Sequence, residues 1–134
     1  MIDIENEVID TIIKAIQTAH TTVKVYAENV ERTNTLPCVT IEQIDNSVYL
    51  DTMTSGNTEN HALISFDINI YTNSAKGKKQ EAKLIAKTID TAMAGLGFIR
   101  TFGGIVPNVA DINVYRLNMK YSAVVSQDKH TFAI

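Results

Sequence analysis

The chain has 134 residues, the size of one ordinary domain, and we expect a single domain over residues 1–134 with one hydrophobic core. Its 45% hydrophobic and 20% charged content is that of a globular protein and not of a disordered or membrane-embedded one. Twelve basic and 15 acidic residues give a net charge of −3, which argues against DNA binding as the main function because such proteins rely on many Lys and Arg contacts to phosphate. The start of the chain is acidic where a signal peptide would be basic, so a cytoplasmic protein is expected.

The first predicted element is an amphipathic helix from about Asp3 to Thr22. Asp3 is suited to cap this helix, and Glu5 and Glu7 place negative charge on its first turn, where the helix dipole favours it. The apolar residues that recur at helical spacing are Ile4, Val8, Ile9, Ile12, Ile13, Ile16 and Ala19.

Two strands and a long connection are predicted next. Residues 21–27 form a β-branched run suited to an edge strand, and Pro37 introduces a second strand over Cys38–Ile44. Residues Asp45–Asn60 follow neither a helical nor a strand period. A connection of this length in a compact domain is usually functional or disordered.

The centre of the fold is predicted at Ala62–Tyr71, where apolar and mostly polar residues alternate as in a strand with one buried face. A helix follows, capped by Asn73 or Ser74 and ended by Gly95 or Gly97. Its apolar residues are Ala82, Ile85, Ala86, Ile89, Met93 and Leu96. Its lysine-rich opposite face suggests either an anion site or, as the favoured interpretation, a solvated surface.

The last third of the chain is predicted to be a strand at residues 98–102, a turn at 103–108, a long partner strand at 112–126 and a short edge strand within 129–134. Two helical apolar stripes need a common partner, so the expected class is α+β. We expect a predominantly antiparallel sheet with both helices packed on one face.

The sequence offers no catalytic, cofactor-binding or metal-binding motif. His20, His61 and His130 stand on separate elements without ligand spacing, and Cys38 is expected to be a buried sheet residue. We therefore expect no enzyme activity, cofactor or metal. The alternative hypothesis is a small enzyme or ligand-binding module built from isolated residues such as His61, Asp67 and Tyr71.

Three segments together resemble a known family. They are Leu36–Glu42, Ser65–Asn73 followed by Gly77-Lys78-Lys79, and Leu96–Phe102. In this order they are similar to the small tail-terminator, or tail-completion, proteins of long-tailed phages and prophages of Gram-positive bacteria. The similarity spans most of the chain and lies in structural residues.

The resemblance implies a homo-oligomeric ring, provisionally a hexamer, on the head-proximal end of the tail tube. Such a ring would end tube polymerisation and join the tail to the filled head, with the tail-tube protein and a head-completion or connector protein as partners. It implies a virion location after assembly in the host cytoplasm, no membrane partner and no sequence-specific nucleic acid, although DNA would pass through the ring. Another connector or minor capsid protein from the same gene neighbourhood is the nearer alternative.

Two sets of residues are predicted to contact partners. The long connection is expected to be the principal partner-binding loop, with a folded-back loop or a hairpin extended past the body of the domain as alternatives; its apolar residues are Val48, Tyr49, Leu50 and Met53. Apolar residues on the otherwise polar face of the sheet are candidate subunit contacts, and these are Leu63, Val114 and Val124.

Overall fold

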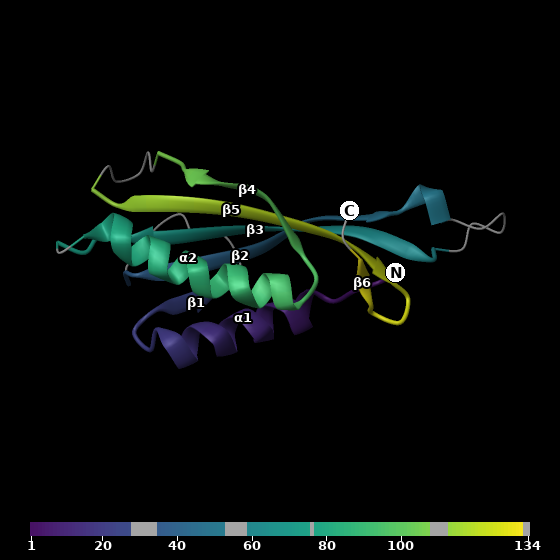
Figure 1. Cartoon of the computed structure of the whole chain (residues 1–134), viewed down its shortest axis with the longest axis horizontal. Coiled ribbons are helices and arrows are strands. Elements are labelled where there is room, and N and C mark those ends of the chain that lie inside the picture. The colour runs from purple at the N-terminus through teal and green to yellow at the C-terminus, as the bar shows by residue number, and fades with distance from the viewer. Residues whose placement is uncertain (28–34, 53–58, 76, 108–112, 133–134) are drawn as a thin grey trace.

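The computed structural model describes residues 1–27, 35–52, 59–75, 77–107 and 113–132. They form a six-stranded, mostly antiparallel sheet with two helices on one face (Figure 1), which confirms the α+β prediction. The elements in chain order are α1 (Glu5–Ala19), β1 (Lys24–Tyr26), β2 (Cys38–Val48), a short 3-10 turn η1 (Leu50–Thr52), β3 (His61–Thr72), α2 (Lys78–Gly95), β4 (Ile99–Ile105), β5 (Tyr115–Ser126) and β6 (Thr131–Phe132).

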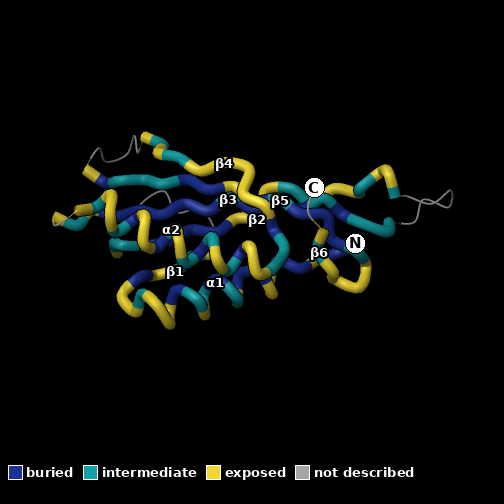
Figure 2. The backbone as a smooth tube through the Cα atoms, viewed as in Figure 1, coloured by how far each residue is buried: buried dark blue, intermediate teal, exposed yellow. Residues whose placement is uncertain are grey.

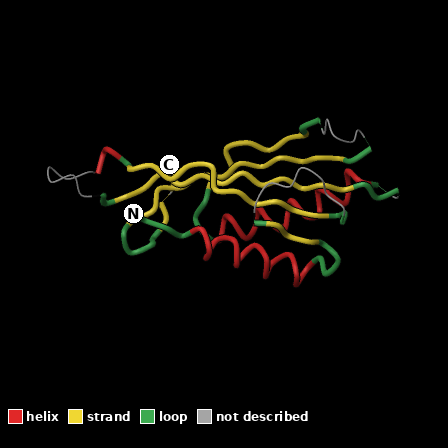
Figure 3. Tube along the Cα trace, turned by 180° about the vertical axis from the view of Figure 1, so that it is seen from behind, coloured by secondary structure: helices red, strands yellow, loops and turns green. Residues whose placement is uncertain are grey.

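The sheet has the order β1-β2-β3-β5-β4, with β6 beside the end of β5. β1 runs parallel to β2, and every other pairing is antiparallel. β5 therefore lies between β3 and β4, two strands that are joined through α2. Seen from behind, both helices lie along one side of the strands (Figure 3).

The central strand β3 is as predicted, because its alternating apolar residues all face the helices. The side chains of Ala62, Ile64, Phe66, Ile68 and Ile70 are fully buried, as are Ile12 and Ile16 of α1 and Ile89 and Met93 of α2. Figure 2 shows that β3 and β5 are largely buried where they pass through the middle of the molecule. The ring of Phe66 meets that of Phe98 edge to face, with 5.6 Å between centroids.

A buried tyrosine connects this core to α2 and to the edge of the sheet. The hydroxyl of Tyr121 donates to Oδ1 of Asp90 at 2.8 Å, and the same oxygen lies 3.0 Å from Nη1 of Arg100. Burial, and then the neighbouring carboxylate, raise the pKa of the Tyr121 hydroxyl above its usual value. The phenol therefore stays protonated and holds α2 against β4 and β5.

The start of each helix differs from the prediction, whereas α2 ends at Gly95 and is followed by Gly97 in a left-handed conformation (φ 87°), as expected. α1 begins at Glu5, whose backbone N–H donates to Oδ1 of Asp3 at 3.1 Å. Asp3 therefore lies before the helix and accepts a hydrogen bond from one of the backbone N–H groups that have no partner within its first turn. α2 begins at Lys78 after Gly77, so the expected capping by Asn73 or Ser74 is wrong. Gly77 has a φ of 136°, which a residue with a side chain rarely adopts, and this explains why the helix starts after it.

Two strands are longer than the sequence pattern indicated. β2 continues to Val48 because residues 45–48 pair with residues 62–65 of β3, after a bulge at Ile44. β4 continues through Gly103 and Gly104 to Ile105, although these glycines were expected to form a turn. In both cases pairing with a neighbouring strand decides the conformation, and local propensity does not.

Candidate interaction surfaces

The paired ends of β2 and β3 form a hairpin arm that extends past the helices (Figure 1). At its tip Leu50 is 72% exposed and Val48 is 36% exposed, while Tyr49 is half-buried and donates its backbone N–H to the carbonyl of His61. The predicted loop over Asp45–Asn60 is thus wrong for residues 45–48, which belong to the β2–β3 hairpin; a hairpin here was one of the alternatives that the sequence left open. Met53 lies outside the described residues.

The N-terminal segment supports this arm on the helix side. Ile2 and Ile4 are buried, and Nδ2 of Asn46 on β2 donates to the carbonyl of Ile2 at 2.8 Å. The N-terminal ammonium group of Met1 lies 3.8 Å from Oε2 of Glu59, just before β3. The N-terminal segment therefore contacts the arm along its length, at Asn46 and at Glu59 near its outer end, so the described part of the arm is not a free loop.

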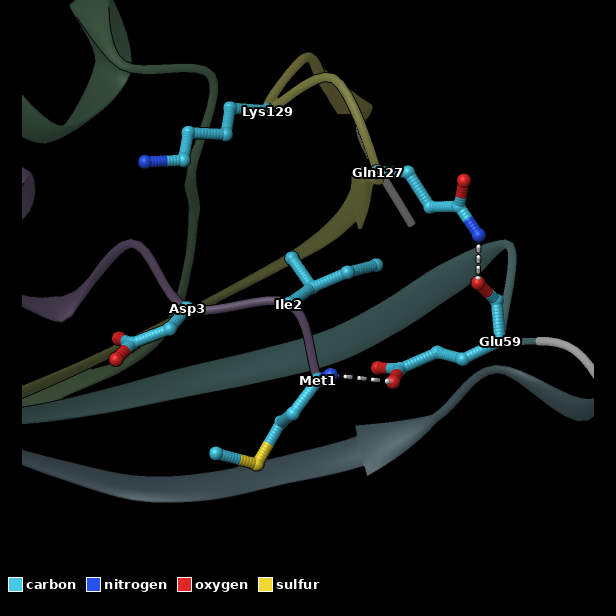
Figure 4. A pocket seen from close by; sticks show the side chains of 6 residues that line it. All are labelled: Met1, Ile2, Asp3, Glu59, Gln127 and Lys129. Carbon is cyan, nitrogen blue, oxygen red and sulfur yellow. Dashed lines mark hydrogen bonds and ion pairs between the residues drawn. The ribbon is translucent and has the colours of Figure 1, made fainter.

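A shallow hollow of about 430 Å³ opens beside this segment (Figure 4). Gln127 closes one side by donating its side-chain amide to the carbonyl of Glu59. Lys129 points away from Glu59 and pairs with Glu7 of α1, with 2.6 Å between nitrogen and oxygen. Among the residues that line this hollow, only Met1 and Glu59 form an ion pair with each other, and the contacts of Met1 and Gln127 with Glu59 tie both terminal segments to the arm.

The face of the sheet without helices carries a connected set of polar side chains. The amide of Asn118 donates to Oδ1 of Asp67 at 2.6 Å and to Oδ1 of Asn69 at 3.0 Å. Nε of Arg116 donates to the same oxygen of Asn69 at 2.9 Å, and its guanidinium lies over the ring of Tyr71. Both asparagines are only 3% exposed, so their polar groups are satisfied within the sheet and not by water.

The predicted subunit contacts on this face are only partly accessible. Leu63 is half-buried. Val124 is 5% exposed and pairs with Phe132 of β6, and Val114 is 8% exposed in a small cluster with Cys38 and Tyr71. The expectation that Val114 and Val124 offer contact surface is therefore corrected, because their own chain covers them.

The residues proposed for a ligand-binding module do not meet. His61, Asp67 and Tyr71 all lie on β3, and His61 and Asp67 are six positions apart, which is about 20 Å along a strand. His61 packs against the ring of Phe132, and His20 makes a 2.8 Å hydrogen bond to Thr88. Within the described ranges no three His, Cys, Asp or Glu side chains are grouped as metal ligands are.

Cys38 is fully buried, as expected of a sheet residue. Burial raises the pKa of its thiol to about 11, so the thiol is almost wholly protonated at neutral pH. A protonated, buried thiol is a poor nucleophile.

The edge strand β4 is a surface that the sequence did not reveal. Its apolar residues Ile99, Phe102 and Ile105 are 41%, 44% and 59% exposed. Ile99 and Phe102 lie opposite Ser122 and Lys120, and Ile105 lies opposite Leu117 on the other face of the sheet. Because Gly103 and Gly104 were expected to form a turn, these side chains were not recognised as parts of one exposed strand. The aromatic and β-branched residues on both sides of the glycine pair were the sequence feature that could have predicted a continuous strand.

The comparisons with known proteins add no relative. The sequence matches no protein-family model, and it has no significant match among curated proteins. Neither described helix is long and apolar enough to cross a lipid bilayer.

Proposed function

We propose that this protein is a phage tail terminator, which caps the head-proximal end of the tail tube and ends its polymerisation. It acts as a homo-oligomeric ring, provisionally a hexamer, and presents the surface that a head-completion or connector protein joins. The phage assignment rests on the resemblance of the three sequence segments described above. In this proposal the protein assembles in the host cytoplasm and remains in the virion.

The observation that carries the proposal is the hairpin arm formed by β2 and β3. It extends past the helices, with β5 beside β3 as far as His61, and has exposed apolar side chains, Val48 and Leu50, near its outer end. Exposed apolar groups on a projecting element are typical of a surface that a protein partner covers. The packing of Ile2 and the bond from Asn46 keep the arm in place, which lowers the entropy lost when it binds.

The test is a polymerisation assay with purified tail-tube protein, in which tube lengths are measured by electron microscopy. Wild-type protein is expected to bind one end of each tube and to shorten the length distribution. Leu50→Asp is expected to abolish this effect because it places a charge in an apolar contact. Leu84→Asp is the matched control, since Leu84 is 48% exposed on α2, away from the arm.

Two outcomes would contradict the proposal. Tubes of unchanged length in the presence of wild-type protein would exclude tube termination. If the protein then bound purified connector protein instead, it would be another head–tail connector component. A strict monomer or two-fold dimer on the tube end would exclude the ring.

A further inference from the structure

We propose that copies of this chain join through the two opposite edges of the sheet, with β4 of one copy pairing with β2 of the next. That a series of copies joined in this way closes into a ring on a tail tube rests on the proposed function. The pairing of β4 with β2 between copies is argued independently of that function.

The first edge is β4. Its only strand partner among the described residues is β5, so the other side of β4 has backbone groups without a neighbouring strand. Six of its seven residues are exposed, and Ile99, Phe102 and Ile105 are apolar. A long, exposed and apolar edge strand is a template for pairing with another chain, and isolated proteins usually protect such edges with charges or prolines.

The second edge is the outer side of β2. β1 pairs only with Cys38, Val39 and Thr40, so no described strand lies beside β2 from Ile41 to Val48. In this part of β2, Ile44 is 48% exposed and Val48 is 36% exposed. The two open edges are on opposite sides of the sheet: β4 ends the strand order on one side, and on the other side the three-residue strand β1 covers only the first part of β2.

The directions of the strands fit a rotationally symmetric contact. β2, β3, β5 and β4 alternate in direction across the sheet, so β2 and β4 run opposite to each other. A rotation about an axis parallel to the strands keeps these directions. β4 of one copy therefore meets β2 of the next as an antiparallel neighbour, which is the common pairing in sheets.

The charges at the two edges are complementary. β2 carries Glu42 and Asp45 on the part that β1 leaves open. On the same face of the sheet, Lys120 is exposed on β5 beside Phe102 of β4, whereas Arg100 lies on the helix face and is already paired with Asp90 of α2. Opposite charges favour the contact of unlike edges and disfavour β4 with β4 or β2 with β2. Because the two surfaces differ, the contact is head-to-tail and suits a closed ring.

The experiment uses one variant for each edge and a control. Phe102→Gln alters the β4 edge and Ile44→Gln the β2 edge, at side chains that are 44% and 48% exposed. Glutamine is neutral, so no new ion pair can form between the two variants. Leu84→Gln, at 48% exposure on α2, is the control. Masses are measured by sedimentation equilibrium up to about 1 mM, where a contact worth only about 4 kcal/mol is half-formed.

Wild-type and Leu84→Gln are expected to self-associate with concentration, and each edge variant alone is expected to associate at least tenfold more weakly. An equimolar mixture of the two edge variants is expected to form a 1:1 dimer and nothing larger. This follows because Phe102→Gln keeps an intact β2 edge and Ile44→Gln keeps an intact β4 edge, so one contact can form between the two variants and no further copy can add. Thermal melts of each variant verify that the fold is retained.

Three results would overturn the inference. They are a wild-type chain that stays monomeric at about 1 mM, an Ile44→Gln variant that associates as well as wild-type, and a mixture that stays monomeric. If wild-type associates in this way but leaves tube length unchanged, the proposed function fails and the edge pairing stands. If both edge variants shorten tubes as wild-type does, the edge pairing fails and the proposed function stands.

Discussion

Replacing Phe66 by Ala tests whether the helix-covered face of β3 is the core of this fold. Phe66 is fully buried on the central strand and its ring lies against that of Phe98. Its neighbours across the sheet are Gln43 on β2 and Tyr121 on β5. Two paired strands fix the backbone at this position, so the surroundings collapse only partly into the space that the ring leaves.

The expected loss has three contributions. Burial of roughly 100 Å² of ring surface is worth about 2.5 kcal/mol. A residual cavity of roughly 60–90 Å³ costs about 1.5–2 kcal/mol at the rate measured for large-to-small core substitutions. The lost edge-to-face contact with Phe98 adds about 0.5–1 kcal/mol. Partial relaxation reduces this sum, so Phe66→Ala should lower the free energy of unfolding by about 3–5 kcal/mol.

The assay is urea denaturation followed by far-ultraviolet circular dichroism, with the midpoint expected to fall and the slope to stay constant. Phe102→Ala is the matched control, because it removes the same ring from a position that is 44% exposed, and it should cost less than about 1 kcal/mol. An equal cost at both positions, or a cost below about 1 kcal/mol for Phe66→Ala, would refute this placement of the core.

Three further predictions concern the polar face, the buried thiol and the hairpin arm. Asn118→Asp should place a second carboxylate beside Asp67 and lower the free energy of unfolding by about 1–3 kcal/mol. Urea denaturation should show a smaller loss near pH 4, because protonation of one of the two carboxyl groups removes their repulsion. The free energy of unfolding should fall above pH 9, because between the pKa of Cys38 in the unfolded chain and its value of about 11 in the folded protein only the folded state keeps the thiol proton. Cys38→Ala should make this fall less steep when stability is measured from pH 8 to 11. An unchanged slope in the variant would contradict the prediction. Replacing residues 50–58 by an Asn-Gly turn should change the free energy of unfolding by less than about 1 kcal/mol. The same variant should no longer cap tubes in the electron-microscopy assay. Normal capping would show that the arm is only a connection between two strands.

The elements with a strong hydrophobic period were predictable from the sequence. β3, β5 and α2 each carry an apolar residue at every position that faces the core, so one pattern fixed both the type of element and its buried face. The short strands at Lys24–Tyr26 and Thr131–Phe132 also lie where the sequence placed edge strands. The parallel direction of β1 was not predictable, because a three-residue strand carries no signal of its partner.

The surfaces were less predictable than the core. Asp45, Asn46 and Ser47 are poor strand formers and become a strand only because β3 pairs with them. Val114 and Val124 looked exposed because their face of the sheet is polar, but other parts of the chain cover them: Phe132 of the following strand β6 pairs with Val124, and Cys38, far away in the sequence, packs near Val114. Such burial depends on tertiary neighbours, and a local pattern does not encode it.

The position of β5 between β3 and β4 has a consequence for how the chain folds during synthesis. β3 pairs with β5 from His61 with Ser126 to Thr72 with Tyr115, so the central pairing of the sheet forms only after most of the chain has left the ribosome. Contacts between residues so far apart in sequence slow folding to roughly milliseconds to seconds. Until β5 pairs with it, the apolar strand β3 has one open edge. The nascent chain is therefore most prone to aggregate in that interval, and expression at lower temperature or with chaperones should raise the yield of soluble protein.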